Sequence, residues 1–309
     1  MSQKKRIVLA GGSGFIGGAL AGEFLARGFY VTVLTRTPRV RSDGVHEVEW
    51  DGEHVGEWIA SLDGAEAVIN LTGKSINCPH TPENLRVITD SRVNSVKALA
   101  SALDQIKVPP RVWVQASAVG FYGDTHDHSC TEAAPNGSGP LADICVQWEG
   151  AFSAVKVAAM RKVTLRIGFV LGRDGGALPV LATLARCFLG GAAGSGKQFI
   201  SWIHLADLVQ MFVAAVENEK FAGIYNAVAP EAATNAEFMH ELRRAFHRPW
   251  SPPVPEFAVR LGAKWMGGEP TLALISQRCV PKRILEAGFR FHFTKLTLAL
   301  RDLCRKNQP

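Results

Sequence analysis

A glycine-rich turn near the start of the chain carries the clearest chemical signal. Residues Gly11–Gly17 read Gly-Gly-Ser-Gly-Phe-Ile-Gly and follow directly on the apolar run Lys5–Ala10. Gly11 permits a tight turn, Gly14 lets the backbone approach a pyrophosphate without an intervening Cβ, and Gly17 lets a helix pack closely on the strand. Backbone N–H groups at the start of that helix then face the negative charge. Because the turn lies between a strand and a helix, we predict a dinucleotide site there.

The residues that end the second β-rich run indicate which dinucleotide is bound. An acidic residue at this place accepts hydrogen bonds from the ribose 2′-hydroxyl of NAD, whereas a basic residue accommodates a 2′-phosphate. Here Thr35 is followed by Arg36, and the first acid is Asp43. Arg36 can pair with a phosphate in a fork geometry, and Arg39 or Arg41 is available to add positive charge. The sequence therefore predicts NADP(H) rather than NAD(H); the alternative is that Arg36 is a solvated loop residue.

The order of the expected elements predicts the fold that positions these residues. Short β-rich runs alternate with helical stretches in the first half of the chain, which is typical of βαβ units. A long crossover helix is expected over Pro82–Ile106 and single strands over Val163–Phe169 and Phe199–His204. We predict an α/β fold, a Rossmann-type doubly wound parallel sheet over residues 1–235 with substrate-side insertions from about residue 172. A small, mostly helical C-terminal lobe is expected over residues 236–309.

Composition narrows the class of protein. Hydrophobic residues make up 47% and charged residues 20% of the 309 residues, which is ordinary for a globular chain. No apolar run approaches the roughly 18–20 residues that span a bilayer, and only Met1–Arg6 precede the first apolar run, so we expect a cytoplasmic protein without a membrane partner. The net charge of +6 is spread along the chain, which favours an anionic small molecule over nucleic acid. The six cysteines are scattered and His126 and His128 lack further ligands nearby, so no metal site is predicted.

Several later motifs resemble one protein family. The glycine turn and the segments that follow the fourth and fifth strands are similar to the epimerase/dehydratase branch of the short-chain dehydrogenases/reductases. Further motifs resemble an atypical subgroup, the NADP-dependent oxidoreductases of the "epimerase family", whose C-terminal lobe is a domain of unknown function. The segments that carry the resemblance are Asn70–Gly73, Ser117–Asp124, Leu165–Gly172, Gly194–Asp207, Asn235–Phe238, His247–Pro249 and Pro281–Arg283.

The resemblance implies a set of cofactor contacts. Leu71 and Thr72 would line the adenine and ribose side where the fourth strand ends, as expected for ligands at the carboxyl ends of strands. Arg92 is on the long helix, where a solvent-facing arginine is an equally good interpretation. With the glycine turn, the predicted cofactor-binding residues are Gly11, Ser13, Gly14, Phe15, Ile16, Gly17, Thr35, Arg36, Leu71, Thr72, Arg92 and Val170.

The usual catalytic pattern of the superfamily is missing from this sequence. Short-chain dehydrogenases commonly use a Tyr-x-x-x-Lys pair, in which the lysine lowers the pKa of the phenol. The three tyrosines, Tyr30, Tyr122 and Tyr225, have Leu, His and Ala four residues later. By the resemblance, Leu141 and Cys145 occupy the places of the tyrosine and lysine. The remaining candidates for catalysis are Ser117 and Tyr122, although the pKa of a phenol without a lysine should stay nearer 10.

Other residues are weaker candidates. His204 and Asp207 could form an acid/base pair, but at a strand-to-helix corner they more often fix the corner. Gly191–Lys197 imitates a phosphate-binding loop, but Gln198 stands where magnesium would need Ser or Thr. We expect an NADP(H)-dependent oxidoreductase acting on a small molecule of unidentified class. The alternative is a non-catalytic NADP(H)-binding sensor or regulator, and a sugar-nucleotide epimerase, which needs an acid/base pair, comes third.

Overall fold

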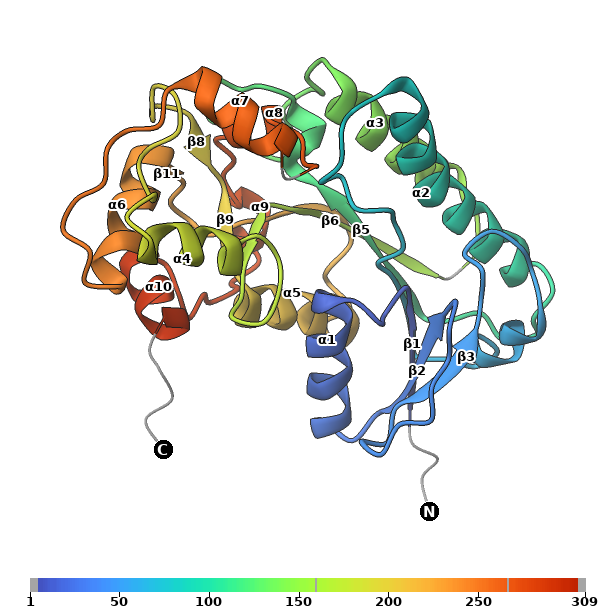
Figure 1. The fold of residues 1–309 in the computed structure, drawn as a ribbon. Coiled ribbons are helices and arrows are strands. Elements are labelled where there is room, and N and C mark those ends of the chain that lie inside the picture. The colour runs from blue at the N-terminus through green and yellow to red at the C-terminus, as the bar shows by residue number, and fades with distance from the viewer. Residues whose placement is uncertain (1–4, 159, 266, 305–309) are drawn as a thin grey trace.

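A seven-stranded parallel sheet forms the centre of the protein. The computed structural model describes residues 5–158, 160–265 and 267–304; the outer ends of the two predicted domains lie outside this range. The strand order is β10-β6-β5-β4-β1-β2-β3, and every neighbouring pair is parallel (Figure 1). The strands are β1 (Arg6–Ala10), β2 (Tyr30–Thr35), β3 (His46–Glu49), β4 (Ala67–Asn70), β5 (Val112–Ala118), β6 (Arg161–Ile167) and β10 (Gly223–Ala227).

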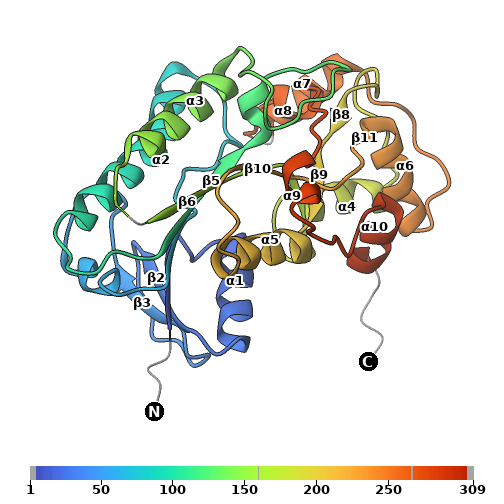
Figure 2. The ribbon, with the colours of Figure 1, turned by 180° about the vertical axis from the view of Figure 1, so that it is seen from behind.

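Helices cover both faces of this sheet. Helices α1 (Phe15–Ala26) and α5 (Leu205–Glu217) lie on one face, and α2 (Pro82–Leu103) and α3 (Pro140–Ala154) lie on the other (Figures 1 and 2). Strand β1 shows why both faces must be covered, because its apolar residues alternate between the two cores: Ile7 and Leu9 on the α1 and α5 side, Val8 and Ala10 on the other. The Rossmann-type fold predicted from the sequence is confirmed.

The order of the strands reverses between β1 and β4. In an open parallel sheet, ligands bind outside the carboxyl ends of the strands at such a reversal. The glycine turn follows β1, and the segment Leu71–Gly73 follows β4, so both predicted contacts meet there.

A third hydrophobic core holds the C-terminal region. It joins residues of α4 (Leu178–Arg186), α6 (Asn235–Ala245) and α10 (Leu296–Cys304), among them Leu178, Phe238 and Leu300. The insertions from about residue 172 therefore pack together with the C-terminal lobe. The remaining elements are the 3₁₀ turns η1 (Glu57–Ser61) and η2 (Val119–Tyr122), the strands β7 (Phe169–Leu171), β8 (Phe199–Ile200), β9 (Trp202–His204) and β11 (Ala233–Thr234), and the helices α7 (Glu256–Trp265), α8 (Thr271–Leu274) and α9 (Lys282–Glu286).

Two predicted strands are each divided in the structure. The strand expected over Val163–Phe169 ends at Ile167 and resumes as β7, while Phe199–His204 is divided into β8 and β9 at Ser201. The two breaks touch: the Phe169 N–H donates to the Ser201 carbonyl at 2.7 Å. A Cβ on Gly168 would lie 2.2 Å from that carbonyl oxygen, so only glycine lets the chains approach. The helix expected to end at Ile106 ends earlier, at Leu103.

A buried carboxylate fixes the placement of the lobe. Asp207, at the start of α5, is fully buried and accepts hydrogen bonds from the backbone N–H groups of His292 and Phe293 at 2.7 and 3.0 Å. This carboxylate therefore ties the C-terminal segment to the core.

Among the described residues, no helix has both the length and the apolar character that crossing a membrane would require.

Candidate dinucleotide site

The glycine turn after β1 has the geometry that its sequence predicts. Gly11 adopts a φ of +70°, and a Cβ on it would lie 2.9 Å from the Cα of Thr72. A Cβ on Gly17 would lie 2.3 Å from the Gly12 carbonyl oxygen, so the helix can pack this closely only without a side chain. A Cβ on Gly14, by contrast, would meet no atom within 4 Å. Gly14 thus borders open space in which a ligand can approach the backbone.

The first turn of α1 leaves its amide groups free for an anion. Gly14 is the N-cap residue and supplies no side-chain hydrogen bond, and the first turn contains no acidic residue. The initial N–H groups of a helix have no partner within it and carry partial positive charge. Phe15 begins the helix, and its ring lies so close to Gly172 and Gly175 that a Cβ on either would overlap it. These amides could hold a pyrophosphate, with Phe15 linking the turn to the C-terminal lobe.

A buried network of side-chain amides supports the segment that follows β4. The Asn70 side chain accepts a hydrogen bond from the Thr72 N–H at 3.0 Å and donates to Ser95 and Gln115 at 3.1 Å each. The side chains of Asn70, Ser95 and Gln115 are fully buried. Thr72 Oγ1 is also buried, yet it has no hydrogen-bond partner among the described residues. A buried hydroxyl without a partner costs stability, so Thr72 is suited to bonding a ligand beside Gly11.

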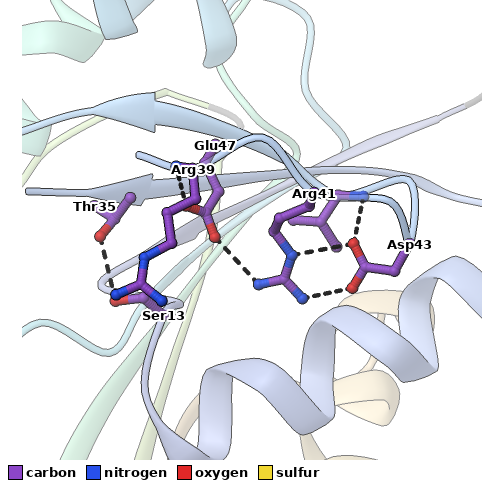
Figure 3. Close-up of polar contacts among 7 residues, drawn as sticks. Ser13, Thr35, Arg39, Arg41, Asp43 and Glu47 are labelled. Carbon is purple, nitrogen blue, oxygen red and sulfur yellow. Dashed lines mark hydrogen bonds and ion pairs between the residues drawn. The ribbon is translucent and has the colours of Figure 1, made fainter. Parts of the chain in front are cut away.

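A cleft opens where β2 ends, and its lining includes three arginines and one acid. Its volume is about 480 Å³, and its walls are Ser13, Thr35, Arg36, Thr37, Arg39, Val40, Arg41 and Glu47. The hydroxyls of Thr35 and Ser13 are 3.3 Å apart and hydrogen-bonded, and the Arg39 side chain extends toward them (Figure 3).

One arginine is bonded to both of the acids near this cleft. Arg41 bonds Asp43 at 2.5 Å and Glu47 at 3.1 Å (Figure 3). The Arg41 guanidinium holds the pKa of Asp43 at about 2. The guanidinium groups of Arg36 and Arg39 make no hydrogen bond or ion pair to any described residue. Two unpaired arginines beside a pair of hydroxyls could hold a phosphate monoester.

The Arg92 side chain packs against the segment that follows β4 and does not extend into solvent. Its guanidinium donates to the carbonyls of Lys74 and Ile88 at 2.9 and 3.0 Å and lies over the Trp148 ring at 5.1 Å. Burial lowers the pKa of Arg92. A Cβ on Gly73 would lie 2.9 Å from its guanidinium carbon, so Arg92 supports the segment that borders the glycine turn.

Val170, the last of the predicted cofactor contacts, belongs to β7. Its carbonyl oxygen would lie 3.2 Å from a Cβ on Gly176, in the loop that covers Phe15. Val170 therefore lies near the start of α1, on the side of the C-terminal lobe.

The two predicted catalytic hydroxyls, Ser117 and Tyr122, share one buried network. Ser117 donates to Glu149 at 2.6 Å, and Glu149 accepts two hydrogen bonds from Arg166 at 2.9 and 2.7 Å. Arg166 also donates to the Tyr122 hydroxyl at 2.8 Å, and this hydroxyl donates to Asn226 at 2.7 Å. Burial raises the pKa of Tyr122 to about 12. Every hydroxyl here is bonded within the protein, which is the opposite of the arrangement at Thr72.

The positions that resemble the catalytic tyrosine and lysine pack against the same turn. The Cβ of Leu141 and the Sγ of Cys145 would lie 3.4 and 3.6 Å from a Cβ on Gly120, in η2. Burial raises the pKa of Cys145 to about 12, so its thiol is protonated at neutral pH. Leu141 and Cys145 therefore contribute packing and no readily exchanged proton.

The weaker candidates have structural partners. The His204 ring accepts a hydrogen bond from the Ala206 N–H at 3.1 Å and stacks on Phe293 at 3.9 Å, and Gln198 donates to the carbonyls of Ala193 and Ala273. The sequence alone does not reveal the Glu149–Arg166 pair, because these residues are 17 apart and only the fold brings them together. Among the described residues, no group of three or more His, Cys, Asp or Glu side chains could hold a metal ion.

Comparison with known proteins places this geometry in a family. The NAD dependent epimerase/dehydratase family matches residues 7–227, and a domain of unknown function (DUF1731) matches residues 254–303. The chain is 34% identical over 303 residues to the epimerase family protein SDR39U1 of Homo sapiens, covering 96% of this chain and 99% of that protein. It is 32% identical over 301 residues to the epimerase family protein SH2119 of Staphylococcus haemolyticus, with 97% and 99% covered.

A solved structure extends the likeness to three dimensions. The crystal structure of human SDR39U1 (isoform 2) with NADPH matches the fold with a TM-score of 0.86 and 32% identity, over 97% of this chain and 99% of that one. The chain belongs to the NAD-dependent epimerase/dehydratase family, as an atypical short-chain dehydrogenase/reductase with a C-terminal domain of unknown function.

Proposed function

We propose that this chain is an NADP(H)-dependent oxidoreductase that acts on a small molecule. The observation that carries the proposal is the cleft at the end of β2, where Arg36 and Arg39 are unpaired and the acids Asp43 and Glu47 are held by Arg41. A 2′-phosphate in this cleft would meet two free cations and the hydroxyls of Ser13 and Thr35. The similar human protein SDR39U1, whose crystal structure contains NADPH, supports the same choice of cofactor.

The rest of the dinucleotide would lie along the glycine turn at the carboxyl edge of the sheet. The pyrophosphate would lie over Gly14 at the amide end of α1, and the Thr72 hydroxyl would bond the sugar nearby. The nicotinamide would exchange hydride with the substrate, and the protein would hold both in place and exclude water.

The test measures NADPH oxidation against a panel of aldehydes and ketones, with wild type and the variant Arg36→Ala. We expect turnover with at least one carbonyl compound, faster with NADPH than with NADH. Arg36→Ala should raise the KM for NADPH by about tenfold or more, since it removes a charged hydrogen bond, and leave the KM for NADH unchanged. An equal rise in the KM for NADPH and the KM for NADH would contradict the assignment of the cleft to the 2′-phosphate.

A second candidate is an NADP(H)-binding protein without turnover. The internal bonding of Ser117 and Tyr122 favours it, because neither hydroxyl is free to donate a proton to a substrate. Tight NADPH binding with no oxidation by any carbonyl compound would support this candidate over the first. Turnover that survives in Tyr122→Phe would instead show that the enzyme draws its proton from another donor.

A further inference from the structure

The segment that follows Gly73 crosses from the carboxyl end of β4 to the C-terminal lobe. We call residues 74–81 the strap; it joins β4 to the start of α2 and passes beside α8 (Figure 1). The strap begins two residues after Thr72, which lies against Gly11 of the glycine turn. Ligands of an open parallel sheet bind outside the carboxyl ends of the strands, so the strap borders the place where the dinucleotide would lie.

One carboxylate of the lobe is bonded to the strap. The His80 N–H donates to Glu269 Oε2 at 2.9 Å, and the Nδ1 of the His80 ring lies 3.9 Å from the same oxygen. The Oε1 of Glu269 accepts hydrogen bonds from the N–H and the hydroxyl of Thr271 at 3.2 and 2.9 Å, at the start of α8. His80 and Glu269 are 189 residues apart in the sequence, and their side chains are 9% and 13% exposed. Glu269 therefore joins the strap to the first turn of α8.

The strength of this contact suits a segment that opens and closes. Burial opposes the charge on Glu269, yet the hydrogen bonds from His80 and Thr271 lower the pKa of this carboxyl below its usual value. The carboxylate is therefore ionised at neutral pH. A hydrogen bond to a charged group shifts an equilibrium by roughly tenfold to a hundredfold. Such a bond favours the closed strap and still leaves an open form within reach of thermal motion.

Both ends of the strap are fixed to the core. The Lys74 carbonyl accepts a hydrogen bond from Arg92 at 2.9 Å, and the Thr81 hydroxyl caps α2 by accepting from the Asn84 N–H at 3.2 Å. Breaking the contact with Glu269 would therefore free the part of the strap between these ends without unfolding α2.

We propose that the strap opens and closes over NADP(H) and that Glu269 holds it closed. The inference rests on the proposed function, because it needs the dinucleotide at the glycine turn. When the hydrogen bond from the His80 N–H to Glu269 breaks, the strap moves away from α8 and the cofactor enters or leaves. Glu269 is a positioning residue in this account, since it acts through the strap and touches no reacting atom.

The first test compares wild type with Glu269→Ala. Amide hydrogen exchange of residues 75–81 in the free protein should quicken by about tenfold or more, because the variant removes the acceptor of the His80 N–H. The dissociation rate constant of NADPH, measured by stopped-flow fluorescence, should also rise by about tenfold. Glu256→Ala is the matched control and should change neither rate, because it removes an acid of α7 that is paired with Arg260.

A reversible cross-link tests whether the strap must move. A Cβ on Gly268 would lie 3.8 Å from the Cγ of Asn77, so cysteines at these two positions are close enough for a disulfide. The variant Asn77→Cys, Gly268→Cys also carries Cys78→Ser, which removes the neighbouring thiol. Diamide takes up the two protons and two electrons that the thiols lose as the disulfide forms. NADPH dissociation should slow by about tenfold or more in the oxidised protein and recover its earlier rate on reduction with dithiothreitol.

Three results would overturn the inference and leave the cofactor assignment intact. In the first, the strap amides of Glu269→Ala exchange at the wild-type rate. In the second, NADPH leaves Glu269→Ala as slowly as it leaves wild type. In the third, the oxidised cross-linked protein releases NADPH as fast as its reduced form. A wild-type protein that binds no NADPH would instead contradict the proposed function, and the inference would fall with it.

Discussion

The two ends of the predicted active site differ in whether their polar groups have hydrogen-bond partners within the protein. At the glycine turn and the end of β2, polar groups are left without partners among the described residues: the Thr72 hydroxyl and the guanidinium groups of Arg36 and Arg39. At the end of β5, Ser117 and Tyr122 are bonded into the Glu149–Arg166 network. The difference teaches that polar groups at the glycine turn and the end of β2 remain available to a ligand, whereas the hydroxyls at the end of β5 are bonded within the protein.

The largest effect is expected from removing one partner of the buried pair. Glu149→Ala leaves the Arg166 guanidinium buried without a counter-ion, which should lower the free energy of unfolding by about 3–5 kcal/mol. Urea denaturation followed by tryptophan fluorescence measures it. Glu286→Ala, which breaks an exposed ion pair with Lys282, is the control and should cost less than about 0.5 kcal/mol.

The opposite result would contradict a stabilising role for the network. If Glu149→Ala changes stability no more than Glu286→Ala does, the pair is dispensable. The double variant Glu149→Leu, Arg166→Met should recover much of the loss, because it leaves no buried charge unpaired.

Adding one methyl group at Gly14 should weaken NADPH binding and leave the stability of the free protein unchanged. In Gly14→Ala the new Cβ enters open space, so the free protein should remain as stable as wild type, while the pyrophosphate loses its approach to the backbone. We expect the Kd for NADPH to rise by about tenfold to a hundredfold in a calorimetric titration. Gly18→Ala is the matched control, because its Cβ also meets nothing within 4 Å but lies a turn further along α1. Weakened binding in both variants would mean that the effect is not local to the turn.

The arginines of the cleft should differ in their contribution to binding. Arg36 is unpaired, whereas Arg41 is bonded to Asp43 and Glu47. Arg36→Ala should therefore weaken NADPH binding by about tenfold, and Arg41→Ala should do so by less, since the Arg41 guanidinium is already occupied by two carboxylates. Comparing the two Kd values at fixed salt concentration checks the order. A larger loss in Arg41→Ala would reverse our assignment of the phosphate contact.

The last effect is absent at neutral pH and concerns the stability of the protein at alkaline pH. Because burial raises the pKa of Tyr122 to about 12, this phenol stays protonated in the native protein while an unfolded chain ionises near pH 10. The unfolded state then binds fewer protons, so the free energy of unfolding falls as pH rises from about 10 to 12, by at most about 1.4 kcal/mol per pH unit. The difference in phenolate absorbance between wild type and Tyr122→Phe should titrate with a midpoint near the higher value. A midpoint near 10 would show that the phenol is accessible to solvent.

The sequence predicts the glycine turn and the strands beside it because their signal is local. The glycines and Arg36 follow directly on strands, and Thr35 ends one. The apolar runs of these strands are easy to recognise, and local backbone geometry fixes where these residues lie. The resemblance then predicted contacts such as Thr72 that lie elsewhere in the chain. Local patterns also predict the parallel sheet, because a chain of alternating strands and helices can adopt only a few topologies.

The rest depends on contacts that no local pattern contains. Ser117 and Tyr122 have the residue types of catalysis, and only the fold shows that Arg166 and Asn226 occupy the hydrogen bonds of Tyr122 and that Glu149 occupies that of Ser117. Likewise, Phe199–His204 has the pattern of one strand, but the approach of another chain segment at Ser201 divides it. Phe257, Leu261 and Trp265 have the spacing of a buried helix face, and only the structure shows that they are exposed.

The central claim is that a phosphate monoester fits at the end of β2. Its most direct test is a calorimetric titration of the wild-type protein with NADPH and, separately, with NADH. We predict that NADPH binds at least about tenfold more tightly, because Arg36 and Arg39 gain a charged partner that NADH lacks. Equal affinity for the two, or tighter binding of NADH, would contradict the account.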